Sequence, residues 1–163
     1  MRLIPSRLCE GYFASRRFDV SQDGTRRHML TASAIVEVSH RVPALDYESL
    51  FQISSFLSGG QDEAQRLYRL MCFNVFAHNR DDHSNNFTWL CDGGVWCLSP
   101  AYDLTYSEGM GHEHATSVLG NGLPKKADLL ALARRVGLSM RWAHTVTDEI
   151  EGVCHDLLTR VGR

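Results

Sequence analysis

The connection from Ala77 to Phe87, "AHNRDDHSNNF", places ionisable and amide side chains between two apolar runs. Within it, Asp81 and Asn86 are five residues apart. Two short β-rich runs follow on either side of an Asp-Gly-Gly turn signal at 92–94, a pattern that predicts a hairpin. Because a hairpin returns the chain to its starting end, Asp103 is expected close to Asn86. Carboxylate and amide oxygens suit Mg²⁺ together with water and phosphate oxygens. The three residues therefore predict a magnesium and phosphate site.

The elements that would position these residues are mostly helical. Apolar periodicity and end signals predict helices over 44–60, 62–78, 124–137 and from Ser139 onwards, where an apolar stripe runs from Trp142 to Val161. The pattern over 31–40 is ambiguous, although Thr31 could cap a short helix there. The N-cap candidates are Thr31, Asp46, Asp62 and Ser139. Segment 62–78 is apolar nearly all round in its second half. It is therefore predicted as the buried central helix that leads into the polar connection.

One further strand is predicted. Residues 11–20 contain alternating and aromatic residues and end at the turn signal "SQDGT". With the hairpin, this predicts a fold that is mainly α with a small β-hairpin (α+β). The length of 163 residues and the lack of repeats or linkers predict a single domain over 1–163.

The composition of the chain excludes several classes of protein. Apolar residues make up 44% of the chain and charged residues 22%, as in soluble globular proteins. No apolar run reaches the roughly 18 residues that a membrane span needs, and the first residues lack a signal-peptide pattern, so a cytoplasmic protein is expected. A net charge of −2 does not favour direct nucleic-acid binding. The five cysteines form no CxxC pair, which argues against a zinc knuckle or a disulfide framework. Cys91 and Cys97 could face each other across the hairpin, although buried reduced thiols are the favoured interpretation.

The spacing of Asp81, Asn86 and Asp103 is also that of a protein-kinase catalytic loop. There, an Asp and an Asn five residues apart precede a hairpin and a second Asp. The sequence "HNRD" at 78–81 is close to the kinase motif "HRD", with one residue inserted. The "YDL" at 102–104 stands where kinases carry "DFG", without the glycine.

The chain resembles the C-terminal lobe of HipA-type toxin kinases, which are bacterial serine/threonine kinases with a phosphatidylinositol-kinase-like fold. The resemblance rests on "RRFD" (16–19), "FNVFAHNRDDHSNNF" (73–87), "LSPAYDLTYS" (98–107), "GHEHATSVLGNG" (111–122) and "ADLLALARRVGL" (127–138). These blocks cover nearly the whole chain.

The resemblance implies a function and its residues. Asp81 would be the catalytic Asp, and Asn86 and Asp103 the Mg²⁺ ligands. His83 would lie beside the phosphates of ATP, and Phe18 would belong to the hinge that contacts adenine. The reaction implied is phosphoryl transfer from Mg·ATP to a protein hydroxyl by the toxin of a type II toxin–antitoxin system. A helix-turn-helix antitoxin or a separate N-terminal lobe is the implied partner.

Two departures from the family pattern bear on that expectation. Asn85 stands where family members usually carry a lysine that faces phosphate. No lysine precedes Lys125, and the glycines before Asp81 form no phosphate-cradling pattern. The sequence therefore predicts a kinase C-terminal lobe that lacks most of the N-terminal lobe and is incomplete as an isolated chain.

Two other functions fit parts of the pattern. A metal-dependent phosphohydrolase could use His78, Asp82, His83 and a loop histidine, His112 or His114, to hold a transition metal. Under the resemblance, these loop histidines would instead shape the peptide-substrate region. A non-catalytic binding module, or pseudokinase, could engage an antitoxin or a separate lobe.

Overall fold

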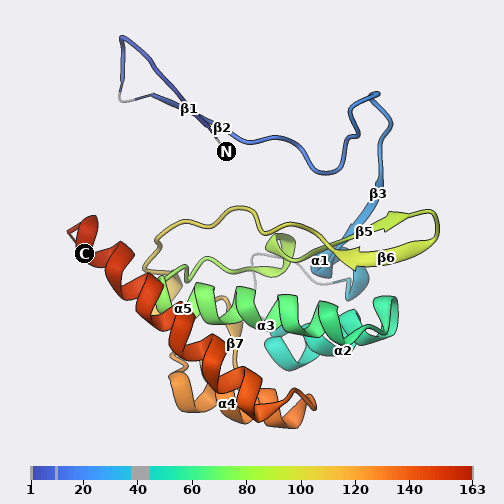
Figure 1. Ribbon diagram of the computed structural model, residues 1–163, viewed down its shortest axis with the longest axis vertical. Helices are drawn as coiled ribbons and strands as arrows, with labels where there is room; N and C mark the ends of the chain where they lie inside the picture. Colours follow the sequence, from blue (N-terminus) through green and yellow to red (C-terminus); the bar gives the residue numbers. More distant parts are fainter. Residues whose placement is uncertain (1, 10, 38–44, 163) are drawn as a thin grey trace.

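The computed structural model describes residues 2–9, 11–37 and 45–162. A layer of helices lies against one side of a small antiparallel sheet, and an N-terminal hairpin projects away from this body (Figure 1). The projecting hairpin pairs β1 (Arg2–Ile4) with β2 (Tyr12–Ala14). The predicted strand over 11–20 is therefore limited to three residues. The architecture is mixed α/β, with helices as the larger part.

The helices follow the predicted order. They are α1 (Ala32–Ile35), α2 (Tyr47–Ser58), α3 (Gln61–Phe76), α4 (Lys126–Arg135) and α5 (Met140–Arg160). The first helix lies within the ambiguous segment 31–40, of which residues 38–40 lie outside the described residues; residue 44 of the next predicted helix does so too.

The predicted helix ends are mostly confirmed. The side chains of Thr31, Asp46 and Ser139 each accept a hydrogen bond from the first turn of the helix that follows. The N-cap prediction for Asp62 is wrong. Gly60 occupies that position, and Asp62 lies in the first turn of α3, where its charge still complements the helix dipole.

The central sheet has the strand order β3-β5-β6 and is antiparallel. Its hairpin, β5 (Thr88–Asp92) and β6 (Val95–Leu98), confirms the prediction from Asp-Gly-Gly, and both glycines have positive φ. The edge strand β3 (His28–Thr31) was not predicted. Nor were the short parallel strands β4 (Leu45–Asp46) and β7 (Thr116–Ser117). The expectation that the hairpin and one further strand make up the β structure is therefore wrong.

The register of the hairpin separates its two cysteines. Cys91 pairs with Trp96, whereas Cys97 pairs with Leu90. Directly opposed residues share a face and neighbouring residues alternate, so the two cysteines point to opposite faces of the sheet. All five cysteines are free thiols. The idea that Cys91 and Cys97 face each other is therefore wrong.

Helix α3 is the centre of the core, as predicted. Its side chains Leu67, Tyr68, Met71 and Cys72 are fully buried. The helix packs against α2 on one side and α5 on the other. The apolar stripe of α5 is buried only in its first half: Val146 is buried, whereas Val153, Leu157 and Val161 are exposed. Across the residues that the structure describes, none of the helices has the length and hydrophobicity needed to cross a bilayer.

Candidate functional site

The polar connection begins where α3 ends. Ala77 closes the helix, and His78 then takes a left-handed conformation with φ of 54°, which turns the chain out of the helix axis. The following side chains have opposite environments: Asp81 is exposed, whereas Asp82 is fully buried. A short 3₁₀ helix, η1 (Ser84–Asn86), then leads into β5.

Asp81 and Asn86 are joined by a hydrogen bond within this connection. The Nδ2 of Asn86 donates to the backbone carbonyl of Asp81 at 2.9 Å. The backbone N–H of Asn86 donates to the carbonyl of His83, also at 2.9 Å. Because the carboxamide nitrogen of Asn86 is already bonded, its Oδ1 is the atom available to a metal ion. The loop thus presents an exposed carboxylate and an amide oxygen close together.

The hairpin returns the chain to this loop, as the sequence predicts. The hydroxyl of Tyr102 donates to the carbonyl of Asn85 and shares a hydrogen bond of 2.6 Å with Oγ1 of Thr88. Asp103 therefore follows a residue that is tied to the end of η1 and the start of β5. Its side chain is exposed, and its backbone has a φ of 54°. An Asp held in the left-handed region marks a constrained position of the kind that clusters at functional sites.

The segment after Asp103 also lies along the connection. The N–H of Ser107 donates to the carbonyl of His78 at 2.9 Å, and the N–H of Arg80 donates back to Ser107 at 3.4 Å. The N–H of Ala115 donates to the carbonyl of Arg80 at 3.0 Å. The connection is thus held by backbone contacts on both sides.

The ring of Phe18 packs against Tyr102, with 5.4 Å between ring centroids. This contact places Phe18 beside the residue that precedes Asp103. Phe18 also lines a cavity of about 380 Å³ with three arginines, Arg16, Arg17 and Arg27. His83 is half-buried at the start of η1. The five residues expected at the site therefore come from the connection itself and from segments that pack against it.

Asp82 is the centre of a buried network that the sequence did not indicate. Its carboxylate accepts hydrogen bonds from Tyr47 Oη at 2.9 Å and from the N–H of Thr116 at 3.2 Å, and it lies 3.2 Å from Nδ1 of His114. The hydroxyl of Thr116 donates to the Asp82 carbonyl. These contacts join the connection to α2 and β7. One signal was present: Asn74 falls on the apolar stripe of α3, and a polar side chain there needs a buried partner.

The arrangement does not assemble the proposed phosphohydrolase site. His114 contacts Asp82, whereas the ring of His78 packs edge-on against Tyr106 at 6.2 Å. Burial, with a smaller effect from Arg80, lowers the pKa of His78. In residues 2–9, 11–37 and 45–162, no three His, Cys, Asp or Glu side chains form a metal-holding group. The oxygen donors of Asn86 and Asp103 instead match the hard-ligand chemistry of Mg²⁺, which takes its other ligands from phosphate and water.

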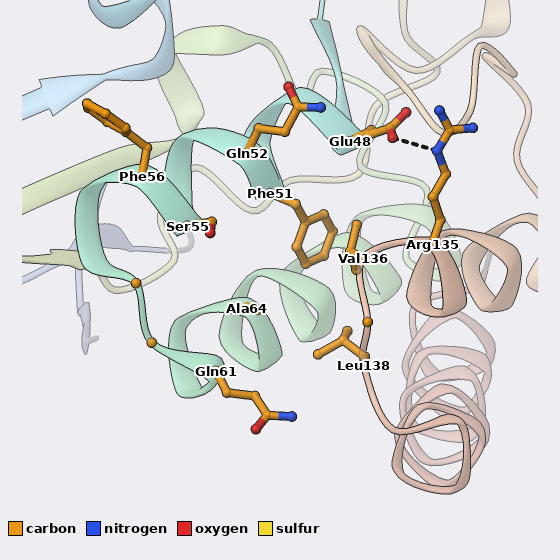
Figure 2. Close-up of a pocket in the computed structure, with 13 residues that line it drawn as sticks. Glu48, Phe51, Gln52, Ser55, Phe56, Gln61, Ala64, Arg135, Val136 and Leu138 are labelled. Atoms are coloured by element: carbon orange, nitrogen blue, oxygen red, sulfur yellow. Dashed lines mark hydrogen bonds and ion pairs between the residues drawn. The ribbon is translucent and has the colours of Figure 1, made fainter.

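A groove of about 710 Å³ lies elsewhere, between α2, the turn into α3 and the turn between α4 and α5 (Figure 2). Phe51 points into it opposite Val136 and Leu138, and an ion pair between Glu48 and Arg135 closes one end. These two charged side chains neutralise each other. The other polar side chains of the lining are those of Gln52, Ser55 and Gln61, so the groove offers no unpaired carboxylate.

Comparison with known proteins gives a family. The chain matches the family model described as HipA-like C-terminal domain over residues 1–158. Among solved structures, it resembles a chain of the Shewanella oneidensis MR-1 toxin–antitoxin complex of HipA, HipB and operator DNA, with a TM-score of 0.69 and 17% identity. The match covers 89% of this chain and 40% of that one, so the chain spans about two fifths of its structural neighbour. A search of curated proteins found no significant match. The family match over nearly the whole length shows that the chain belongs to the HipA-like C-terminal domain family.

Proposed function

We propose that the chain is the catalytic C-terminal lobe of a HipA-like serine/threonine kinase, which transfers the γ-phosphoryl group of Mg·ATP to a protein hydroxyl. The observation that carries this proposal is the closed arrangement of Asp81, Asn86 and the segment before Asp103. Asn86 is bonded to the Asp81 carbonyl, and Tyr102 is bonded to the carbonyl of Asn85. Residues from two sides of a hairpin thus present oxygen donors around one loop.

Each residue then has a distinct role. Asp81 orients the attacking hydroxyl and accepts its proton, because it is the exposed carboxylate that the loop fixes from within. Asn86 and Asp103 hold the metal through their side-chain oxygens. When bound, Mg·ATP supplies the phosphoryl group and the neutralising charge. The rest of the catalytic effect comes from positioning, which the hydrogen bonds of the connection provide.

The nucleotide would extend from the metal site toward Phe18. This ring packs on Tyr102, so an adenine held beside it would leave the phosphates directed toward Asp103 and His83. The arginines around Phe18 supply positive charge in the same cavity, although Arg17 is paired with Asp19 and Arg27 with Asp92. Asn85, in place of the family lysine, contributes no charge to the phosphates.

The proposed lobe needs a second lobe to hold the nucleotide from the other side. The first lysine of the sequence is Lys125, and the family resemblance places an ATP-anchoring lysine and a phosphate loop upstream of the catalytic lobe. We propose that another segment or another chain supplies both. The structural neighbour is found in a complex of HipA, HipB and operator DNA. An antitoxin partner and a cytoplasmic toxin role are therefore part of the proposal for this chain.

The test separates metal binding from chemistry. The chain is mixed with a HipA-like N-terminal lobe, and both Mg·ATP binding, by calorimetry, and phosphorylation of protein substrates are measured. Asp81→Ala is expected to abolish transfer but to leave Mg·ATP binding unchanged, because Asp81 faces the hydroxyl rather than the metal. Asp103→Ala is expected to lose both. Asp156→Ala, on the exposed face of α5, is the control that should lose neither.

Two results would contradict the proposal. Transfer retained in Asp81→Ala or in Asp103→Ala would remove that residue from the mechanism. An intact wild-type pair of lobes that binds no Mg·ATP would favour the alternative, a non-catalytic module that engages an antitoxin or another lobe.

A further inference from the structure

A continuous chain of buried hydrogen bonds runs from Asp82 to the backbone of Asp103. Tyr47 Oη donates to Asp82 at 2.9 Å, and Nδ2 of Asn74 donates to Tyr47 Oη at 2.9 Å. Nδ2 of Asn79 donates to Oδ1 of Asn74 at 3.0 Å and to the carbonyl oxygen of Asp103 at 3.5 Å. The chain therefore crosses from α2 through α3 into the loop that carries one proposed metal ligand.

All its members except Asp103 are inaccessible to solvent. Tyr47 and Asp82 are fully buried, and Asn74 and Asn79 are each 2% exposed. Three buried amide or hydroxyl side chains in one cluster, from α2, α3 and the connection after α3, are unusual, because apolar residues fill such positions at lower cost. Side chains of this kind are tolerated in a core when they are bonded to one another, as they are here.

Three of the four bonds have their donors directed toward Asp82, whereas the bond from Asn79 to the Asp103 carbonyl points the other way. Asn79 donates to Asn74, Asn74 donates to Tyr47, and Tyr47 donates to the carboxylate of Asp82. A carboxylate at the accepting end polarises each bond in turn and strengthens the series. Burial, followed by the neighbouring charge of Asp82, raises the pKa of Tyr47 well above its ordinary value. Its hydroxyl therefore stays protonated and remains a donor.

The orientation of Asn79 is determined by this direction. Both partners of its Nδ2 are carbonyl oxygens, so rotating the carboxamide would bring Oδ1 against two acceptors. Its Oδ1 is buried and has no hydrogen-bond partner among the described residues. The side chain thus leaves its own acceptor unpaired while it donates to Asp103. This arrangement is expected of a residue that holds the Asp103 carbonyl in place.

We propose that Asn79, Asn74 and Tyr47 are positioning residues, anchored by Asp82, that hold the Asp103 backbone in its left-handed conformation. None of the three touches the reacting groups. Their effect on metal affinity rests on the proposed kinase function, whereas their effect on the Asp103 backbone does not. The chain also extends to His114, which lies 3.2 Å from the same carboxylate. The loop after Asp103 is therefore coupled to Asp103 through the interior of the protein.

Tyr47→Phe interrupts the chain by removing a single oxygen. The ring, which packs edge-on against Phe87 at 5.5 Å, remains in place. Tyr68→Phe is the matched control. Tyr68 is also fully buried, and its hydroxyl hydrogen-bonds Oγ1 of Thr147 at 2.8 Å, on the α5 side of the core and outside the chain. Each variant removes one buried hydroxyl, which makes two hydrogen bonds in Tyr47 and one in Tyr68, and only the hydroxyl of Tyr47 leads to Asp103.

The direct measurement is the carbonyl ¹³C resonance of Asp103, which moves upfield when this carbonyl loses hydrogen bonding. We expect an upfield shift in Tyr47→Phe, a larger one in Asn79→Ala and none in Tyr68→Phe. An Asp103 resonance unchanged in Tyr47→Phe, or shifted equally in Tyr68→Phe, overturns the proposal. Should Asn79→Ala fail to fold, the comparison of the two tyrosine variants still decides the outcome.

A second measurement tests the consequence for the metal site. Mn²⁺ is titrated, with electron paramagnetic resonance as the readout, into a mixture of the chain, a HipA-like N-terminal lobe and a non-hydrolysable ATP analogue. Tyr47→Phe is expected to bind Mn²⁺ roughly fivefold more weakly than wild type, which corresponds to a loss of about 1 kcal/mol of binding free energy. Tyr68→Phe is expected to bind Mn²⁺ as wild type does. Wild-type protein that binds no Mn²⁺ contradicts the proposed kinase function. In that case, the Asp103 carbonyl resonances of the two tyrosine variants still decide whether the buried hydrogen bonds position the Asp103 backbone.

Discussion

Replacement of Asp82 by alanine is expected to lower the free energy of unfolding by about 3–5 kcal/mol. The Asp82 carboxylate is fully buried and has three neighbours at hydrogen-bonding distance: Tyr47 Oη at 2.9 Å, His114 Nδ1 at 3.2 Å and the N–H of Thr116 at 3.2 Å. Alanine leaves these groups without their partner. An unpaired buried polar group costs about 1–3 kcal/mol. The low end of that range, applied to each of the three groups, already gives about 3 kcal/mol.

Urea denaturation followed by circular dichroism measures this loss. With a slope of about 2 kcal/mol per molar urea, the midpoint of Asp82→Ala should fall by about 1.5–2.5 M. Asp82→Asn, which keeps the volume and one acceptor, should lose less. Asp81→Ala is the matched control, since Asp81 is adjacent but exposed, and its change should stay within about 0.5 kcal/mol. Equal midpoint shifts for the alanine variants of the two neighbours would refute the reasoning.

Two further predictions concern the loop after Asp103 and the core. Gly109 has a φ of 70°, and a Cβ there would come within 2.8 Å of the Cβ of Arg80, whereas Gly111, with a φ of 68°, has open space. Gly109→Ala should therefore lower the free energy of unfolding by about 1–3 kcal/mol more than Gly111→Ala does, and equal losses in urea would exclude the close contact. Burial raises the pKa of Cys72 from 9.0 to about 12, so its thiol stays protonated in the folded chain after it ionises in the unfolded one. The stability that this shift contributes is present below about pH 9 and is lost as the pH rises toward about 12. Urea denaturation at a series of pH values should therefore show wild type losing stability faster than Cys72→Ala between these two pH values. Equal losses in the two proteins would contradict the shift.

The return of the chain to the polar connection, where Tyr102 contacts Asn85, could be predicted because it depends on local signals. Asp-Gly-Gly determines a tight turn, the flanking residues favour strands, and a hairpin fixes the distance between its ends. Helix ends are similarly local: Asp46 and Ser139 accept hydrogen bonds from residues two or three positions away. Even the wrong N-cap, Asp62, lies only two residues from the correct one, Gly60.

The network around Asp82 could not be predicted in the same way. Its partners Tyr47 and His114 are 35 and 32 residues away along the chain, and no turn or repeat relates their positions. The pairing of β3 with β5 was missed for the same reason, because a four-residue strand takes its stability from a partner rather than from its own pattern. Only Asn74, a polar residue on an apolar stripe, indicated that the interior contains a polar cluster.

The two adjacent aspartates show why this network bears on the proposed chemistry. Asp81 and Asp82 lie in the non-helical part of the connection, where consecutive side chains point in different directions. Because Asp82 is bound on the inside by groups from α2 and from the segment around β7, the backbone at this point has little freedom to rotate. The direction of Asp81 toward solvent follows from that constraint, since its neighbour is held in the core. The same carboxylate anchors the hydrogen-bond chain that ends at the Asp103 carbonyl. One buried acid thus constrains both the proposed catalytic residue and one proposed metal ligand, although it contacts neither substrate nor metal in the mechanism that we propose.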